Sequence, residues 1–201
     1  RLKKMKINSV AIDEAHCISQ WGYDFRPSYL NIAKLKEELP DIPFVALTAT
    51  ATPEVVVDIQ EKLLFKASNV IQKSFLRKNL SYVVRKTENQ VATMLKVIDG
   101  AKGSGIVYTS TRKRTKEIAQ VLLQHGLKAD YYHAGLSSDD RQMKQANWIQ
   151  NKTQIIVATN AFGMGIDKAN VRFVIHIDLP NSLEAYFQEA GRAGRDERKA
   201  F

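Results

Sequence analysis

The sequence predicts an α/β fold in which parallel sheets are flanked by helices, and two features of the chain support this expectation. Short apolar runs alternate with segments of helical spacing along most of the chain. Such alternation is typical of parallel strands joined by helical crossovers. Polar motifs stand where the apolar runs stop, and ligands of open parallel sheets bind beyond the carboxyl ends of the strands. We therefore expect the functional residues at those ends.

The expected elements fall into two groups along the chain. Strands are expected at residues 7–12, 43–47, 105–109, 128–133, 154–159 and 172–178, and helices at 29–39, 52–64, 88–99, 112–125, 137–150 and from 182 onward. Thr52, Pro53 and Glu54 supply an N-cap, a first-turn proline and an acidic first turn. Residues 69–85 look extended, which puts the boundary near residues 70–88. It divides a partial first lobe at 1–75 from a nearly complete second lobe at 76–201.

Composition and charge narrow the class of protein. The 201 residues are 44% hydrophobic, as in a globular protein, and carry 30 Lys and Arg against 21 Asp and Glu. The resulting formal charge of +9 favours a polyanionic partner such as nucleic acid, although a solvated basic surface would give the same charge. One cysteine excludes an intrachain disulfide and a cysteine-rich zinc site within this segment, which fits a reducing, intracellular setting.

The chain shows no sign of a membrane segment. No apolar run approaches the roughly 20 residues that span a bilayer, and the first six residues lack the apolar core of a signal peptide. The sequence begins as if cut from a longer protein.

Two adjacent carboxylates, Asp13 and Glu14, directly follow the first expected strand. In that place Asp13 can hold Mg²⁺, through water, while Glu14 can orient and deprotonate a water that attacks a γ-phosphate. An Asp-Glu pair by itself is more often a solvated turn. The neighbouring residues have to decide between these interpretations.

An aromatic stretch follows the two carboxylates. Trp21, Tyr23 and Phe25 alternate, so in an extended loop their rings can share one face beside Arg26. Bases of single-stranded nucleic acid stack on such rings with about 1 to 3 kcal/mol per base, whatever the base sequence. The alternative is that these rings fill the core.

Near the end of the chain, Arg192 and Arg195 stand three residues apart in a glycine-containing segment. They can present two guanidinium groups to one anion, and one of them can be an arginine finger. Gly163 and Gly165 permit unusual backbone angles and close approach to a ligand, and Asp167 follows them.

Together these segments resemble the RecQ family of ATP-dependent DNA helicases, which belong to superfamily 2. Residues 13–27, DEAHCISQWGYDFRP, closely resemble the Walker B motif and the aromatic-rich loop of that family. In family order, residues 47–52 resemble motif III, 105–112 motif IV, 157–168 (VATNAFGMGIDK) motif V and 188–196 (QEAGRAGRD) motif VI. The agreement covers essentially the whole chain.

The resemblance implies RecA-like lobes, of the bacterial type, with the first lobe incomplete and the second truncated at its C-terminal end. It implies 3′ to 5′ movement on single-stranded DNA and unwinding of duplexes, driven by ATP with Mg²⁺, in DNA repair and recombination. The implied partners are single-stranded and partially duplex DNA, with further repair proteins unidentified and no membrane. The implied location is the bacterial nucleoid in the cytoplasm.

The family pattern assigns roles to residues of this chain. The implied catalytic residues are Asp13, Glu14, Gln188, Arg192 and Arg195, with Arg195 as the first choice for the γ-phosphate contact. Nucleotide contacts are implied for Asp13, His16, Asp167, Arg192 and Arg195, with Asp13 at the metal. DNA contacts are implied for Trp21, Tyr23, Phe25, Arg26, Arg112, His133, Thr159 and Asn160, and coupling between DNA and ATP for Thr48, Thr50, Gly163 and Gly165.

Two departures from the family pattern matter. The family usually has histidine where this chain has Tyr23, which stacks but carries no positive charge near neutral pH. None of the ten glycines is followed by lysine, so the Walker A loop that cradles the phosphates is absent from this segment. The family's zinc-binding and winged-helix regions would lie downstream, so zinc belongs only there. We do not expect this segment to hydrolyse ATP alone.

Two other functions stay open. The segment can be a non-catalytic DNA-binding or regulatory piece whose motor motifs are vestigial or completed by another chain. A DEAD-box-like RNA helicase would share the lobes but gives no reason for the aromatic loop.

Overall fold

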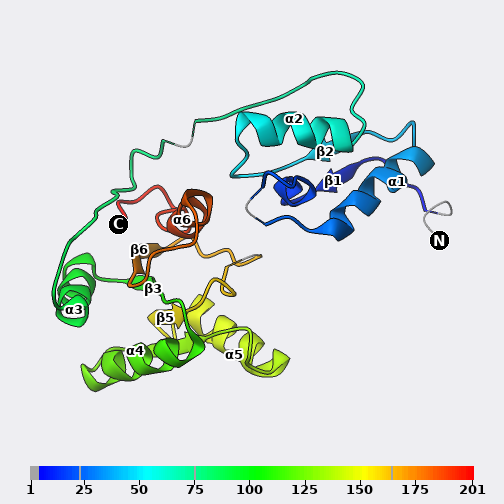
Figure 1. The fold of residues 1–201 in the computed structure, drawn as a ribbon. Helices are drawn as coiled ribbons and strands as arrows, with labels where there is room; N and C mark the ends of the chain where they lie inside the picture. Colours follow the sequence, from blue (N-terminus) through cyan, green and yellow to red (C-terminus); the bar gives the residue numbers. More distant parts are fainter. Residues whose placement is uncertain (1–4, 23, 75, 164) are drawn as a thin grey trace. The chain divides into compact units, whose positions relative to one another are not determined.

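The computed structural model describes residues 5–22, 24–74, 76–163 and 165–201. The chain forms two compact units, Arg1–Ser74 and Phe75–Phe201, which are described one at a time (Figure 1). The expected α/β architecture with parallel sheets is confirmed in both units.

The first unit is built on two short parallel strands, β1 (Val10–Ile12) and β2 (Phe44–Ala46), in which Val10 pairs with Phe44. Two 3-10 helices, η2 (Ala15–Ile18) and η3 (Pro27–Leu30), and the helix α1 (Asn31–Glu38) connect the strands. Helix α2 (Pro53–Lys62) follows β2. The core of the first unit is a cluster of buried side chains from β1, η2 and α2 and the residue after it: Ile12, Ala15, Ile18, Val55, Ile59 and Leu63.

Helix α2 begins as the sequence predicts. The Thr52 side chain accepts a hydrogen bond from the backbone N–H of Val55 at 3.5 Å, and Pro53 occupies the first turn. Val55 and Ile59, one turn apart, are buried, whereas Val57 between them is 54% exposed. The helix therefore buries one face in the core cluster that it shares with η2 and β1.

The second unit contains a four-stranded parallel sheet in the order β4-β5-β3-β6. Its strands are β3 (Ser104–Tyr108), β4 (Ala129–Tyr132), β5 (Ile155–Ala158) and β6 (Val171–His176). Its helices are α3 (Gln90–Ala101), α4 (Arg112–Gln124), α5 (Ser138–Ile149) and α6 (Leu183–Ala190), visible from green to red in Figure 1.

The two central strands of this sheet are buried on both faces. Ile106 and Tyr108 of β3 pack in one cluster with Trp148 of α5, whereas Val107 between them packs in another with residues of α3 and α4. Successive strand residues point to opposite faces, so helices on both faces cover the sheet. This double burial accounts for the continuous apolar runs of the sequence.

Most expected elements differ from the observed ones by a few residues at their ends. Expected strand 7–12 is reduced to Val10–Ile12, because only these residues form a ladder with β2. Within residues 69–85 the described part contains no helix and only one bridge, from Leu80 to Ala200. Among the described residues, no helix is both long and apolar enough to cross a bilayer.

Gly105 lies in β3 against the buried ring of Phe173, and a Cβ atom at residue 105 would come within 2.0 Å of that ring. Gly105→Ala should therefore lower the free energy of unfolding by about 1–3 kcal/mol through overpacking. Gly100→Ala in α3 is the matched control, because no heavy atom lies within 4 Å of its Cβ position. It should stabilise the helix by about 0.5–1 kcal/mol. Urea denaturation of both variants measures the difference, and equal effects would contradict this packing.

Candidate functional site

Asp13 and Glu14 leave the carboxyl end of β1 as expected. The Asp13 side chain is exposed, and its Oδ1 accepts a hydrogen bond from the backbone N–H of Glu14 at 2.9 Å. Glu14 has a left-handed backbone, with φ 49° and ψ 42°. Non-glycine residues seldom adopt this conformation, and such strain is concentrated at functional sites. The turn thus fixes two adjacent carboxylates at the sheet edge.

His16 connects this turn to the segment after β2. Its ring is buried, and Nδ1 lies 3.0 Å from Thr48 Oγ1 and 3.5 Å from Glu14 Oε2. The same Thr48 hydroxyl accepts the backbone N–H of Thr50 at 3.4 Å. Thr50 Oγ1 is itself buried and has no hydrogen-bond partner among the described atoms. Glu14, His16, Thr48 and Thr50 therefore form one contiguous group.

The aromatic stretch divides into an exposed and a packed part. Trp21 is 79% exposed, so it does not fill the core, whereas Phe25 is half-buried with Lys62 Nζ 5.9 Å from its ring centre. Arg26 forms an ion pair with Asp24, and this hydrogen bond raises the pKa of Arg26. Tyr23, the third predicted ring, lies outside the described residues.

Asp24 and Cys17 have no role predicted from the motifs, but they contact one another in the structure. The Cys17 thiol is buried and donates to Asp24 Oδ2 at 3.8 Å, while its sulfur lies 3.7 Å from His16 Nε2. Burial raises the pKa of Cys17 to about 11. The thiol therefore stays protonated at neutral pH and holds the aromatic stretch against η2.

In the second unit, residues 159–163 and 165–168 lie between β5 and β6 without regular secondary structure, and this segment is named here the 159–168 loop. Thr159 is buried at the end of β5, and its Oγ1 accepts the backbone N–H of Ala161 at 3.4 Å, while Asn160 is exposed. Gly165 has φ 71°, a left-handed conformation that favours glycine. A side-chain to backbone hydrogen bond at Thr159 and a left-handed glycine at Gly165 thus contribute to the conformation of the loop.

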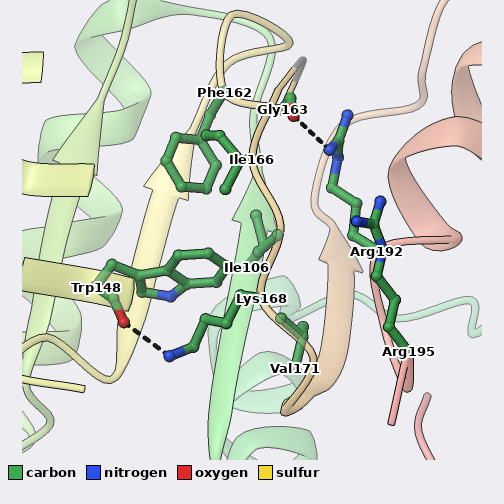
Figure 2. A pocket seen from close by; sticks show the side chains of 9 residues that line it. All are labelled: Ile106, Trp148, Phe162, Gly163, Ile166, Lys168, Val171, Arg192 and Arg195. Atoms are coloured by element: carbon green, nitrogen blue, oxygen red, sulfur yellow. Dashed lines mark hydrogen bonds between the residues drawn. The ribbon is translucent and has the colours of Figure 1, made fainter. Parts of the chain in front are cut away.

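Both motif VI arginines contact this loop, and Figure 2 shows the contact of Arg192 with Gly163. Arg192 is buried, and its Nη1 donates to the backbone oxygen of Gly163 at 2.6 Å. A Cβ atom at residue 163 would come within 2.2 Å of that guanidinium, so a larger residue there would displace Arg192 from this position. The more exposed Arg195 pairs with Asp167 at 2.8 Å. Gln188, the other predicted residue of this motif, lies in α6.

Arg112 and His133 lie close to one another beside the ends of β3 and β4. His133 is 5% exposed, and neither ring nitrogen has a hydrogen-bond partner among the described atoms. Burial first, and then the charges of Lys116 and Arg112, lower the pKa of His133. The Arg112 guanidinium covers Gly135, where a Cβ atom would come within 2.7 Å of it. Both residues thus belong to one basic region.

Comparison with known proteins identifies the family. Residues 89–197, more than half of the chain, match the family described as the helicase conserved C-terminal domain. The chain belongs to this helicase family. The resemblance to RecQ-family helicases is also confirmed, because the ATP-dependent DNA helicase RecQ of Bacillus subtilis is 49% identical over 197 residues. That alignment covers 97% of this chain and 33% of the relative.

Two further relatives show the breadth of the family. The RecQ-like DNA helicase blm-1 of Caenorhabditis elegans is 49% identical over 92% of this chain and 19% of its own length. A putative ATP-dependent RNA helicase of Acanthamoeba polyphaga mimivirus is 47% identical over 97% of this chain and 36% of its own length. The chain therefore spans about a third or less of the length of the Bacillus subtilis and Caenorhabditis elegans relatives.

The fold is shared with solved structures of lower identity. Dbp5 of Saccharomyces cerevisiae, in a complex with RNA and ADP BeF3, superposes with a TM-score of 0.74 at 21% identity. The match covers 100% of this chain and 54% of that one. It shows a common RecA-like fold.

The burial of His16 has a consequence for stability. Burial lowers the pKa of His16, despite the opposing charge of Glu14, so the unfolded chain binds more protons than the folded one. The free energy of unfolding should therefore fall as pH drops below about 6.5, the pKa of an unperturbed histidine. His16→Gln removes this titration, so its stability should decline less between about pH 7 and about pH 5. Urea denaturation across that range measures the slopes, and a variant slope as steep as the wild-type slope would contradict this origin.

Proposed function

We propose that the protein to which this chain belongs is an ATP-dependent DNA helicase of the RecQ type. The observation that carries the proposal is the 49% identity to Bacillus subtilis RecQ along 97% of the chain, which includes all five motifs. Because the chain covers 33% of that relative, the activity belongs to the longer protein. Residues 1–75 and 76–201 would contribute parts of its two motor lobes.

Glu14 is the proposed general base of ATP hydrolysis. Its left-handed backbone and the 3.5 Å contact of its Oε2 with His16 Nδ1 fix its carboxylate in one place. A fixed carboxylate can orient a water for attack on the γ-phosphate and accept its proton. His16 would position Glu14 and transmit changes at Thr48 to it.

Asp13 fits the Mg²⁺ that ATP-dependent helicases use. Its carboxylate is exposed, and carboxylate oxygens are the ligands that Mg²⁺ prefers, often through water. When bound, Mg²⁺ neutralises charge on the β- and γ-phosphates. The residue's own contribution is an oxygen donor held beside Glu14 by the 2.9 Å hydrogen bond.

Arg195 is the proposed contact to the γ-phosphate, and Arg192 supports it. Arg195 is paired only at the surface, with an Asp167 side chain that is 83% exposed, so exchanging this partner for a phosphate costs little. Arg192 is buried on Gly163 and is suited to fix the loop. An arginine that stabilises the transition state contributes roughly 10³- to 10⁵-fold in rate. Gln188 would act on the nucleotide side of the same motif.

Single-stranded DNA is the proposed ligand along which the helicase moves. The exposed ring of Trp21 offers a stacking surface in the same stretch as Phe25 and Arg26. Tyr23 is assigned to this stretch by the family pattern alone. In the second unit the proposed backbone contacts come from Arg112, His133, Thr159 and Asn160. The net charge of +9 favours the phosphates at both places. Thr48, Thr50, Gly163 and Gly165 would couple these contacts to the nucleotide.

The direction and setting of this activity are inferred from the resemblance to the RecQ family alone. We propose 3′ to 5′ movement on single-stranded and partially duplex DNA, in repair and recombination at the bacterial nucleoid. RNA is the second candidate substrate, because one relative at 47% identity is named a putative RNA helicase. DNA is favoured by the aromatic stretch, which resembles that of the DNA helicases.

The base assignment is tested in the intact parent protein by Glu14→Gln. This change keeps the size and polarity of the side chain but removes its proton-accepting charge. The rate of ATP hydrolysis should fall by about 10²- to 10⁴-fold, while ATP binding stays intact. Glu38→Gln at the exposed end of α1 is the matched control and should keep the wild-type rate. Full turnover in Glu14→Gln would remove Glu14 from the mechanism.

A further inference from the structure

Lys168, the last residue of the 159–168 loop, is a buried lysine that caps a helix. Its side chain is 6% exposed and points to the C-terminal end of α5 (Figure 2). Nζ donates to the backbone oxygen of Trp148 at 2.8 Å, to that of Ile149 at 3.1 Å and to Asn151 Oδ1 at 2.7 Å. The three protons of the ammonium group therefore have three acceptors.

The end of α5 is suited to receive a cation. The last carbonyl groups of a helix lack partners within the helix and carry the negative end of its dipole. Asn151, just beyond α5, has φ 60°, so the chain leaves the helix through a left-handed residue. Burial lowers the pKa of Lys168, which is a cost that the three short hydrogen bonds offset.

Trp148 links both ends of the 159–168 loop. Its indole N–H donates to the backbone oxygen of Gly105 in β3 at 3.2 Å, which fixes the ring in the core. The ring of Phe162, near the start of the loop, meets the indole edge-on at 5.2 Å, and Lys168 Nζ lies 5.0 Å from the indole at the other end of the loop. Residues near both ends of the loop thus contact the same buried side chain, Trp148.

We propose that Lys168 is a positioning residue of the helicase motor, which holds the 159–168 loop in the conformation that couples DNA binding to ATP hydrolysis. This inference rests on the proposed function. The same loop contacts Arg192 through the backbone oxygen of Gly163, and it contacts Arg195 through Asp167, the neighbour of Lys168. A shift of the anchored end therefore moves the partners of both arginines.

Lys168→Met in the intact parent protein is the main test. Methionine fills much of the same volume but leaves the two carbonyl groups of α5 and the Asn151 side chain without the ammonium group. The maximal DNA-stimulated rate of ATP hydrolysis should fall between about 10-fold and about 100-fold, as for a misplaced catalytic group. The ATP concentration at half-maximal rate should stay the same. Lys152→Met, an exposed lysine in the turn after α5, is the matched control and should behave as wild type.

Hydrogen exchange separates positioning from a purely structural role. In Lys168→Met the amides of residues 160–167 should exchange faster, while those of β3 stay protected. Lys168→Arg should recover part of the lost rate, because a guanidinium also donates to carbonyl groups. If Lys168→Met does not fold, the hydrolysis rate and the hydrogen exchange are measured in Asn151→Gly instead. Glycine keeps the left-handed backbone at residue 151 and removes one of the three acceptors of Lys168 Nζ.

The outcomes distinguish the two proposals. A folded Lys168→Met protein with wild-type DNA-stimulated rate and wild-type exchange in residues 160–167 would overturn the positioning role and leave the proposed function standing. The positioning role would also be overturned if Lys168→Met had a lower melting temperature but kept the wild-type DNA-stimulated rate of ATP hydrolysis at temperatures well below it. A wild-type parent protein without nucleic-acid-stimulated hydrolysis would overturn the proposed function and the positioning role together.

Discussion

The burial of the β3 and β5 strands on both faces is the constraint on which the second unit depends. Ile155, Ile156, Val157 and Ala158 of β5 are all fully buried, so no side chain of this strand is available for chemistry. Polar residues can appear only where the strand stops, and the 159–168 loop begins at that point. Asp13 and Glu14 likewise come directly after a strand, β1, although that strand is buried only at Ile12.

The functional groups found by this rule are held by buried polar contacts and not by the sheet alone. Arg192 on the Gly163 oxygen and Lys168 on the end of α5 restrain the 159–168 loop at two places. His16 restrains Glu14 and Thr48 in the first unit. Because an unpaired buried polar group is costly, each contact favours one arrangement strongly over its alternatives. Such restrained groups are suited to pass a change at one ligand to another.

The sequence predicted the parallel α/β fold and the place of each motif, because both follow from local pattern. The Thr52 cap of α2 is visible in three consecutive residues. What the sequence did not predict depends on tertiary contacts. Trp21 and Phe25 look alike in the pattern, yet only Trp21 is largely exposed. Lys168 looks like a surface charge, and its acceptors lie 17 to 20 residues earlier in the chain.

The most direct test of the account is ATP hydrolysis by the intact parent protein, measured without nucleic acid, with single-stranded DNA and with single-stranded RNA. The 201-residue chain, which lacks a Gly-Lys phosphate loop, is the control. The account predicts strong stimulation by DNA, weak stimulation by RNA and no hydrolysis by the control. Stimulation by RNA alone would move the substrate to the RNA helicases. Absence of hydrolysis with either nucleic acid would contradict a motor function and favour a non-catalytic binding protein.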